Sequence, residues 1–313
     1  MIRNICFSSI LGSVIAFGLV ACGGGGQKDL PLDDPLERTM DVGKEAVYYH
    51  RLQQAETQYK LAFDYALRRN DASEIDDAGY NLAVVQLGLD QLSKTQATIQ
   101  QTRNELYVRN QANSYQLDLV EAGLFFRQNQ LSRSATLAMN AQQSDQEDIQ
   151  ERAYFLSGLI ADRMRNTDQL QIYLQKLDAL IQKSKHDASD TWKDDQAELQ
   201  ARLAFQSGQF AQTLVNADKA ENIRRNEIEY RSMARVIALK AQAEQALGNN
   251  RAAAAYYLQA GQSAALLKDK YQARLWLNQA MSPSADQITY NLAFSQLKKL
   301  EHEDKKSKSN AQH

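Results

Sequence analysis

Residues 201–220 read ARLAFQSGQFAQTLVNADKA, and residues 241–260 read AQAEQALGNNRAAAAYYLQA. Each stretch opens on an alanine, reaches Gly208 or Gly248 at the same position, and closes on an alanine, so the unit repeats after 40 residues (201 to 241). Alanine, glutamine, leucine and arginine, which fill both stretches, favour helices, whereas glycine commonly ends them. The pattern therefore predicts pairs of helices joined at these two glycines.

The same kind of break recurs along most of the chain. Polar or glycine-containing breaks follow one another at intervals of about 36 to 43 residues, and they are Gly88–Asp90, Gln128–Gln130, Arg165–Thr167, Ser207–Gln209 and Gly248–Asn250. Small residues precede the breaks at similar intervals: Ala83, Ala122, Gly158, Ala201 and Ala241. Because small side chains let helices approach closely, these positions are predicted at helix crossings.

The motif around each break resembles the tetratricopeptide repeat, with a small residue in a first helix, a turn, and small residues in a second helix. Tyr80–Ala83 is similar to part of that first helix. The resemblance covers about residues 44–300, although the spacing exceeds the family's 34 residues and its closing proline is absent. It implies an all-α, right-handed α-α superhelix of about six helical hairpins plus a capping helix, Ser284–Leu300.

The composition independently favours an all-α protein. Only 3 of the 313 residues are proline, and none lies between Pro35 and Pro283. Alternating runs of β-branched residues, which are typical of strands, are missing. With 36 basic and 38 acidic side chains, the chain has no net positive charge to attract nucleic acid. A hydrophobic fraction of 43% excludes both a disordered chain and a polytopic membrane protein.

Three short patterns predict where helices begin. Ser144 to Glu147 and Ser284 to Gln287 both match the capping box, in which a hydroxyl residue precedes Glu or Gln by three positions. Asp71 with Glu74 is a weaker version of the same signal.

The start of the chain is predicted to be a secretion signal. Arg3 is the only charge in it, and residues 5–20, ICFSSILGSVIAFGLV, are uncharged. A membrane-spanning helix needs about 20 apolar residues, so this shorter run is more typical of a cleaved signal. Leu19-Val20-Ala21-Cys22 ends it and resembles the lipobox of bacterial lipoproteins, in which an aliphatic, a tolerant and a small residue precede an invariant cysteine.

This resemblance implies a lipid-anchored protein. Residues 1–21 would be the signal peptide, cut between Ala21 and Cys22, and Cys22 would carry diacylglycerol and an acylated amine such as palmitate. Gly23, where aspartate would signal inner-membrane retention, implies the outer membrane with the body facing the periplasm. An ordinary secretory signal that happens to contain a cysteine is the alternative. Because Cys6 would leave with the signal, the mature chain would form no disulfide.

The segments flanking the repeats are predicted to lack a fold. Residues 22–43 are rich in glycine and contain two prolines, which indicates a flexible tether. Residues 301–313 are poor in apolar side chains and balanced in charge, so we expect a disordered tail. The folded domain is therefore expected over residues 44–300.

Residues suited to metal binding or base catalysis are scattered. His50, His186, His302 and His313 lie far apart, and no HExxH motif or His/Cys pair has metal-ligand spacing. His50 is expected on a helix face, packed against neighbouring tyrosines such as Tyr59. No glycine-rich phosphate loop is present. The sequence therefore predicts neither a metal site, nor a cofactor, nor an enzyme.

The paired charges also have simpler interpretations than catalysis. Asp76-Asp77 and Asp194-Asp195 are expected to point about 100° apart on a helix, too far for an acid–base pair. The acidic group from Asp145 to Glu151 fits a helix N-terminus that complements its own dipole. Arg224-Arg225 is too isolated to track a phosphate backbone.

Binding is thus the expected function. A superhelix presents a concave face made by the first helix of each pair, suited to a peptide or partner helix. Asn81 occupies a position that hydrogen-bonds a ligand backbone in some tetratricopeptide domains, although a solvated helix asparagine is the simpler interpretation. Related lipoproteins assist outer-membrane assembly, pilus biogenesis or regulation of cell-wall enzymes. The alternatives are a solute- or glycan-binding lipoprotein, which needs a closed pocket, and a helical cell-wall hydrolase, which needs a buried carboxylate facing a cavity.

Overall fold

The computed structural model describes residues 33–111, 114–184 and 190–310, and this part of the chain is helical throughout. It contains fourteen helices and no strand over those ranges, which confirms the all-α prediction. The helices are α1 (Asp34–Tyr48), α2 (Leu52–Arg69), α3 (Ala72–Gly88), α4 (Leu92–Tyr107), α5 (Tyr115–Arg127), α6 (Leu131–Ala141), α7 (Glu147–Arg163), α8 (Thr167–Ser184), α9 (Asp190–Gln206), α10 (Phe210–Asn226), α11 (Tyr230–Ala246), α12 (Asn250–Leu266), α13 (Lys270–Ala280) and α14 (Gln287–Asn310).

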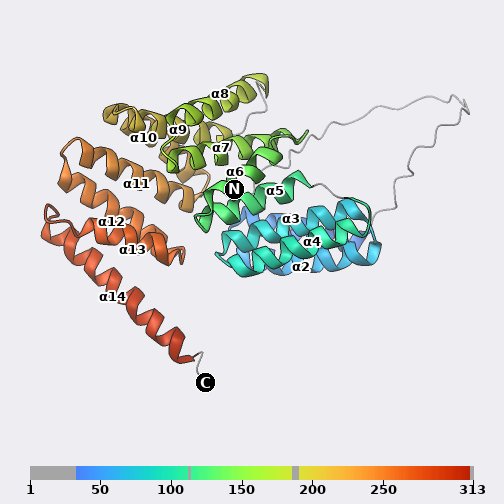
Figure 1. Ribbon diagram of the computed structural model, residues 1–313. Helices are drawn as coiled ribbons and strands as arrows, with labels where there is room; N and C mark the ends of the chain where they lie inside the picture. The colour runs from blue at the N-terminus through green and yellow to red at the C-terminus, as the bar shows by residue number, and fades with distance from the viewer. Residues whose placement is uncertain (1–32, 112–113, 185–189, 311–313) are drawn as a thin grey trace, which may run out of the picture.

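The helices stack as pairs into an α-solenoid. Most helices pack on the next one in the chain, and the first helices of successive pairs also contact one another: α3 on α5, α5 on α7, α7 on α9 and α9 on α11. We call these five helices the inner layer, because the first helices of such pairs line the concave side of a superhelix. Figure 1 shows the stack following an arc from α2–α4, through α8–α10, to α11–α14.

All five predicted breaks are turns between paired helices. One residue at each takes a left-handed φ, and these residues are Asp90, Asn129, Arg165, Gly208 and Gly248. The next amide then returns to a carbonyl five residues earlier, as from Gln91 to Gln86 over 2.9 Å and from Gln209 to Ala204 over 2.8 Å. This is the Schellman motif, which satisfies carbonyls at a helix end that would otherwise lack a donor.

Residues with a left-handed φ also end helices at positions that the predicted breaks do not include. His50, Asn70, Asn110, Ile228 and Lys268 take left-handed φ at other helix ends. Ile228 has a φ of 60°, although a β-branched side chain is strained in this region. The Glu229 amide still donates to the Arg224 carbonyl over 2.9 Å. Packing of α10 against α11 therefore overrides the local preference of this residue.

The predicted small residues do lie where helices cross. Ala83, Ala122, Ala201 and Ala241 are fully buried. At Gly158 of α7, an added Cβ would lie only 2.7 Å from the side chain of Leu199 in α9. The inner layer can pack this tightly at α7 and α9 only because Gly158 has no side chain.

The folded body begins earlier than predicted, at Asp34, so the tether assigned to residues 22–43 is wrong from residue 34 onward. Asp33 caps α1 by accepting a hydrogen bond from the Leu36 amide, and Pro35 occupies the first turn, where proline favours a helix. Leu36 is fully buried in the first hydrophobic core. With α1, the helix count exceeds the thirteen of six hairpins and a cap by one.

The last helix is also longer than predicted. α14 begins at Gln287 rather than at Ser284, and it runs to Asn310 rather than ending at Leu300. The predicted disorder of residues 301–313 is therefore wrong for residues 301–310. Lys270 Nζ lies 2.6 Å from Asp304 Oδ1, and Arg274 pairs with the same carboxylate. These ion pairs to α13 tie down a segment whose own sequence is merely balanced in charge.

One of the three predicted helix starts is confirmed. The Asp71 carboxylate accepts from two amides in the first turn of α3. The two capping boxes are wrong in detail: Glu147 pairs with Lys183 at 2.7 Å instead of reaching back, and Asp286 caps α14 in place of Ser284. In both cases another side chain offers a better partner than the predicted one.

Candidate partner-binding surface

Six arginines lie in the helices of the inner layer, and one of them, Arg152 of α7, pairs with the buried carboxyls Glu151 and Asp195. The other five are Arg127 of α5, Arg163 of α7, Arg202 of α9, and Arg231 and Arg235 of α11, and we call them the inner arginine array. Because the inner layer is expected to line the concave side, its side chains are the first candidates for contact with a partner. Four members form ion pairs with carboxylates of the fold.

Arg163 is the exception in the array. It lies at the end of α7 with its guanidinium 4.3 Å above the centre of the Phe126 ring, and its Nη1 donates to the Phe126 carbonyl over 3.3 Å. Among the described residues, no carboxylate forms an ion pair with it. Burial lowers the pKa of Arg163, and the positive charges of Arg202 and Arg235 lower it further. The charge of the neighbouring Asp162 opposes this lowering of the pKa.

Arg202 and Arg235 share one carboxylate. Arg202 Nη2 lies 2.6 Å and Arg235 Nε 2.7 Å from Oε1 of Glu198, and Arg202 also pairs with Asp162. Burial alone would raise the pKa of Glu198, but Arg224, Arg235 and Arg202 together hold it well below its usual range. Glu198 is therefore a buried anion on which three arginines depend.

Beneath the array lies a buried ionic cluster centred on Arg224 of α10, whose side chain is 0% exposed. Its Nη2 lies 3.3 Å from Asp194 Oδ1 and 2.8 Å from Asp195 Oδ1, and its Nη1 pairs with Glu198. The expectation that Asp194 and Asp195 diverge is wrong, because both reach one guanidinium. Burial, with a smaller contribution from Asp195, raises the pKa of Asp194 to about 9, so this group is protonated at neutral pH.

Glu151 of α7 is a second buried carboxyl with a shifted pKa. Its side chain is inaccessible, and neither of its oxygens accepts a hydrogen bond from the described residues. Arg152 forms an ion pair with it, with Nε 3.5 Å from Oε2 of Glu151. Burial raises the pKa of Glu151 well above its usual value, despite the opposing charge of Arg152. Glu151 is therefore a buried carboxyl and not, as predicted, part of a solvated acidic group at the start of the helix.

No single pattern in the sequence points to these buried groups. Asp194 and Glu198 are four residues apart in α9, and the buried Ala197 and Ala201 lie on the same face of this helix. Carboxylates on the buried stripe of a helix imply a cationic partner. The sequence does not say that this partner is Arg224, which lies on the following helix.

A set of long-range contacts joins the two halves of the arc. Arg127 pairs with Asp90 at 3.0 Å and with Asp269 at 3.5 Å, and Arg231 pairs with Asp269 at 2.6 Å. Arg231 Nη2 also donates to the Gly88 carbonyl over 3.4 Å. We call Asp90, Arg127, Arg231 and Asp269 the clasp, since their contacts connect helix ends up to 142 residues apart.

His50 also connects the two halves of the arc, and its position differs from the one predicted. It is not on a helix face but in the turn between α1 and α2, with a φ of 55°. Its ring stacks on Tyr230 at the start of α11, with the ring centres 6.5 Å apart. The first pair of helices therefore also contacts the second half of the arc.

The predicted site residues do not meet at one place. Asn81 lies on α3 in the inner layer, where its Nδ2 donates to the Asp77 carbonyl over 2.8 Å. One of its amide donors is thus used within its own helix, in keeping with the simpler interpretation. Ala21 and Cys22 lie outside the described residues, so their roles in cleavage and lipidation stay predictions.

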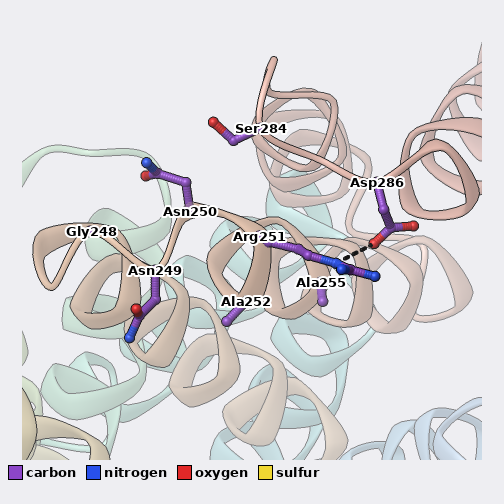
Figure 2. A pocket seen from close by; sticks show the side chains of 8 residues that line it. All are labelled: Gly248, Asn249, Asn250, Arg251, Ala252, Ala255, Ser284 and Asp286. Carbon is purple, nitrogen blue, oxygen red and sulfur yellow. Dashed lines mark ion pairs between the residues drawn. The ribbon is translucent and has the colours of Figure 1, made fainter.

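Two surface hollows accompany the solenoid. The larger, of about 680 Å³, lies between the α11–α12 turn and the start of α14, where Arg251 pairs with Asp286 at 3.5 Å (Figure 2). The smaller, of about 310 Å³, lies among α8, α9 and α10 and is lined mostly by uncharged polar side chains such as Gln171 and Gln200. Neither is a closed pocket, and the buried carboxyls Glu151 and Asp194 line neither of them.

Within the described ranges, no group of three or more histidine, cysteine or acidic side chains could hold a metal ion. None of the helices in those ranges has the length and apolar character needed to cross a bilayer.

Comparison with known proteins shows the fold and not a family. No family model matches the chain, and no curated protein matches it. A signal-transduction ATPase with a tetratricopeptide repeat sensor from Pyrococcus horikoshii aligns with a TM-score of 0.55 and 13% identity, covering 87% of this chain and 40% of that one. At such identity the likeness concerns the fold alone. It supports the tetratricopeptide-like body predicted from the repeats.

Two other solved structures align less closely. A tetratricopeptide repeat protein from Parabacteroides merdae has a TM-score of 0.44 and 15% identity, covering 84% of this chain and 100% of that one. PilF from Pseudomonas aeruginosa has a TM-score of 0.45 and 13% identity, covering 78% of this chain and 97% of that one.

Proposed function

We propose that this chain is a lipid-anchored scaffold of the bacterial envelope that binds protein partners through its inner layer. The observation that carries the proposal is the tetratricopeptide-like solenoid, since such folds serve as extended binding surfaces. The inner layer adds polar and charged side chains suited to hydrogen bonds with a peptide or a partner helix, above all the inner arginine array. The proposed role is binding and not catalysis.

The proposed location rests on the lipobox. Cys22 would carry diacylglycerol and an acyl group, and several acyl chains give a stable anchor where one would be marginal. Gly23 in the following position favours the outer membrane, with the solenoid in the periplasm. Confinement beside the membrane would raise the effective concentration of the scaffold for partners in the same layer. Those partners are proteins or peptides of the envelope, whether in outer-membrane assembly, pilus biogenesis or cell-wall enzyme regulation.

Replacing the predicted lipidated residue tests the location. Cys22→Ser removes the thiol but leaves the helical body unchanged, so we expect the variant to move from the membrane to the soluble periplasmic fraction. Cys6→Ser is the matched control, because Cys6 belongs to the segment that would be removed, and it should leave the protein in the membrane. Retention of the Cys22→Ser variant in the membrane would contradict the anchor.

The binding role requires a separate experiment. Chemical cross-linking in living cells, followed by purification of this chain and mass spectrometry, should recover a small set of envelope proteins with the wild type. The Cys22→Ser variant should recover less of the same proteins, because it is no longer confined. Recovery of no protein above an unrelated periplasmic lipoprotein would contradict the scaffold role.

A further inference from the structure

The first half of α14 is apolar on its solvent side as well as on its packed side. Thr289 and Ala293 are buried where α14 packs on α12 and α13. Four large apolar side chains of the same turns are nevertheless between 40% and 72% exposed, and we call them the α14 patch: Ile288, Tyr290, Leu292 and Phe294. A helix that is apolar all round is normally covered all round. Figure 1 shows α14 at the outer end of the arc, where its solvent side is open to a second molecule.

Part of the patch occupies positions that the other helices of the stack cover. Asp286 caps α14, so Tyr290 and Phe294 are the fourth and eighth residues after the cap. The residues at these two positions in α10 and α12 are all buried, and they are Thr213, Ala217, Ala253 and Tyr257. In α14 the same two positions carry aromatic rings, and α12 and α13 leave both rings open.

The surface around the patch carries no charge. Residues 287–297 contain no acidic or basic side chain, although 24% of the whole chain is charged. A helix that lies on a membrane surface has many basic residues on its polar face, whereas the exposed polar side chains here include Asn291 and Ser295. The centre of a protein–protein interface is typically depleted of charge. The patch therefore suits another apolar protein surface better than lipid headgroups or a charged partner.

The patch is complementary to itself when two copies of α14 lie antiparallel. Residues four apart on a helix are neighbours on its surface. Ile288 and Leu292 therefore form an aliphatic ridge, and Tyr290 and Phe294 form an aromatic ridge whose rings stack with their centres 6.4 Å apart. Asn291 lies between the ridges. A two-fold axis beside Asn291, perpendicular to the helix, places aliphatic ridge against aliphatic ridge and aromatic ridge against aromatic ridge.

Charge favours the antiparallel arrangement over a parallel one. Lys298 and Lys299 follow directly after the uncharged stretch. In a parallel pair each lysine would lie beside the same lysine of the second copy, and like charges repel. In the antiparallel pair about Asn291, Lys298 lies opposite Ser284 of the second copy instead. The net charge of the whole chain is only −2, so two copies repel each other little.

We propose that two copies of this chain pair through the α14 patch, with their α14 helices antiparallel and Asn291 close to the two-fold axis. This inference goes beyond the proposed function, because it adds a surface for self-association and leaves the inner layer free for other partners. The contact extends over about 17 Å of helix, which is small for a stable interface of about 1,200 Å² or more. The pair is therefore weak in dilute solution, and confinement of both copies to one membrane would strengthen it.

A cysteine introduced at the two-fold axis tests the pairing in living cells. Cells that make the full chain with Asn291→Cys are treated with a membrane-permeant bis-maleimide of short spacer, which joins two thiols in any compartment. We expect a product of twice the mass of the chain, at a level well above that of the parent chain without the new cysteine. The comparison with the parent removes any contribution from Cys6 and Cys22.

Two matched controls separate the patch from the rest of the surface. Phe294→Glu, added to Asn291→Cys, places a carboxylate in the apolar contact and should lower the dimer about tenfold. Leu61→Glu introduces the same charge at a leucine of α2 that is exposed to a similar degree, and it should leave the dimer unchanged. Val215→Cys, on the exposed side of α10, should give little dimer. Circular dichroism of the purified variants confirms that each remains helical.

Several results would overturn the inference. These are no dimer from Asn291→Cys, as much dimer from Val215→Cys, or a dimer that Phe294→Glu does not reduce. A product whose mass is not twice that of the chain would show that a different protein covers the patch. A monomer whose new thiol resists a water-soluble maleimide would place the patch in lipid. Each of these outcomes refutes the pairing and leaves the proposed function standing, because partner capture by the scaffold is measured independently.

Discussion

Glu198 and Asp194 are two buried carboxyls on one helix whose replacement should have very different effects. They lie one turn apart in α9, both contact Arg224, and both side chains are 0% exposed. Glu198→Gln removes a charge that three arginines share, whereas Asp194→Asn replaces a group that already carries a proton at neutral pH. Each substitution preserves shape, so the pair separates the effect of charge from that of packing.

The structure sets the magnitudes. Removing one partner of a buried ion pair costs about 3–5 kcal/mol, because the remaining charge is left uncompensated. Glu198→Gln should therefore lower the free energy of unfolding by about this amount, which corresponds to a loss of roughly 10 °C in Tm for a chain of this size. Asp194→Asn should change it by less than about 1 kcal/mol at neutral pH, since no charge is lost.

The two variants should also differ in pH dependence. The folded pKa of Asp194, about 9, lies above its ordinary value of 3.8, so the folded protein binds an additional proton between these values. Stability from this group is complete below pH 4 and is lost as the pH rises through about 9. Glu198 has the opposite sign: its lowered pKa stabilises the fold at neutral pH, and that contribution is lost in acid.

Thermal unfolding followed by circular dichroism, at pH 3, 7 and 10, measures both effects. Asp194→Asn should match the wild type at pH 7 and become the more stable of the two at pH 10. Glu198→Gln should be far less stable at pH 7 and approach the wild type as the pH falls. Equal losses in the two variants at pH 7 would refute the assignment of charge within the cluster.

Two further substitutions test the turns and the clasp. Ile228→Gly should stabilise the protein by about 1 kcal/mol, because glycine adopts the left-handed φ of 60° without strain, and an unchanged or lower Tm would argue against that strain. Arg231→Glu should open the clasp at a cost of about 1 kcal/mol, since its ion pairs are partly exposed. Small-angle scattering should then report a larger radius of gyration. Identical scattering from the wild type and Arg231→Glu would show that the clasp does not hold the arc.

Local chemistry predicts the turns better than the helix ends. Gly208, Gly248 and Asp90 mark turns because their residue types tolerate a left-handed φ, and all three occur as expected. Ile228 carries no such mark, since its conformation is imposed by the helices on either side. The prolines and charges near Pro35 indicate a linker when read alone, yet Pro35 lies in the first turn of α1 and Leu36 is buried beneath it.

Charge burial is the part that composition and spacing could not predict. Asp304 keeps α14 helical through Lys270 and Arg274, which are more than a helix away in the chain. Arg224 looks like part of a surface pair in the sequence, but its partners lie on α9 and bury it completely. Such pairs depend on which helices stack, and that is known only once the solenoid is assembled.

The central claim is that partners bind the inner layer, and site-resolved photo-cross-linking in living cells tests it most directly. A photoreactive residue at Asn81 or at Met164, beside Arg163, should capture envelope proteins. The same residue at Val215, which is 61% exposed on the second helix of its pair, should capture little. Capture from Val215 equal to that from Asn81 or Met164, or capture from Val215 alone, would contradict binding at the inner layer.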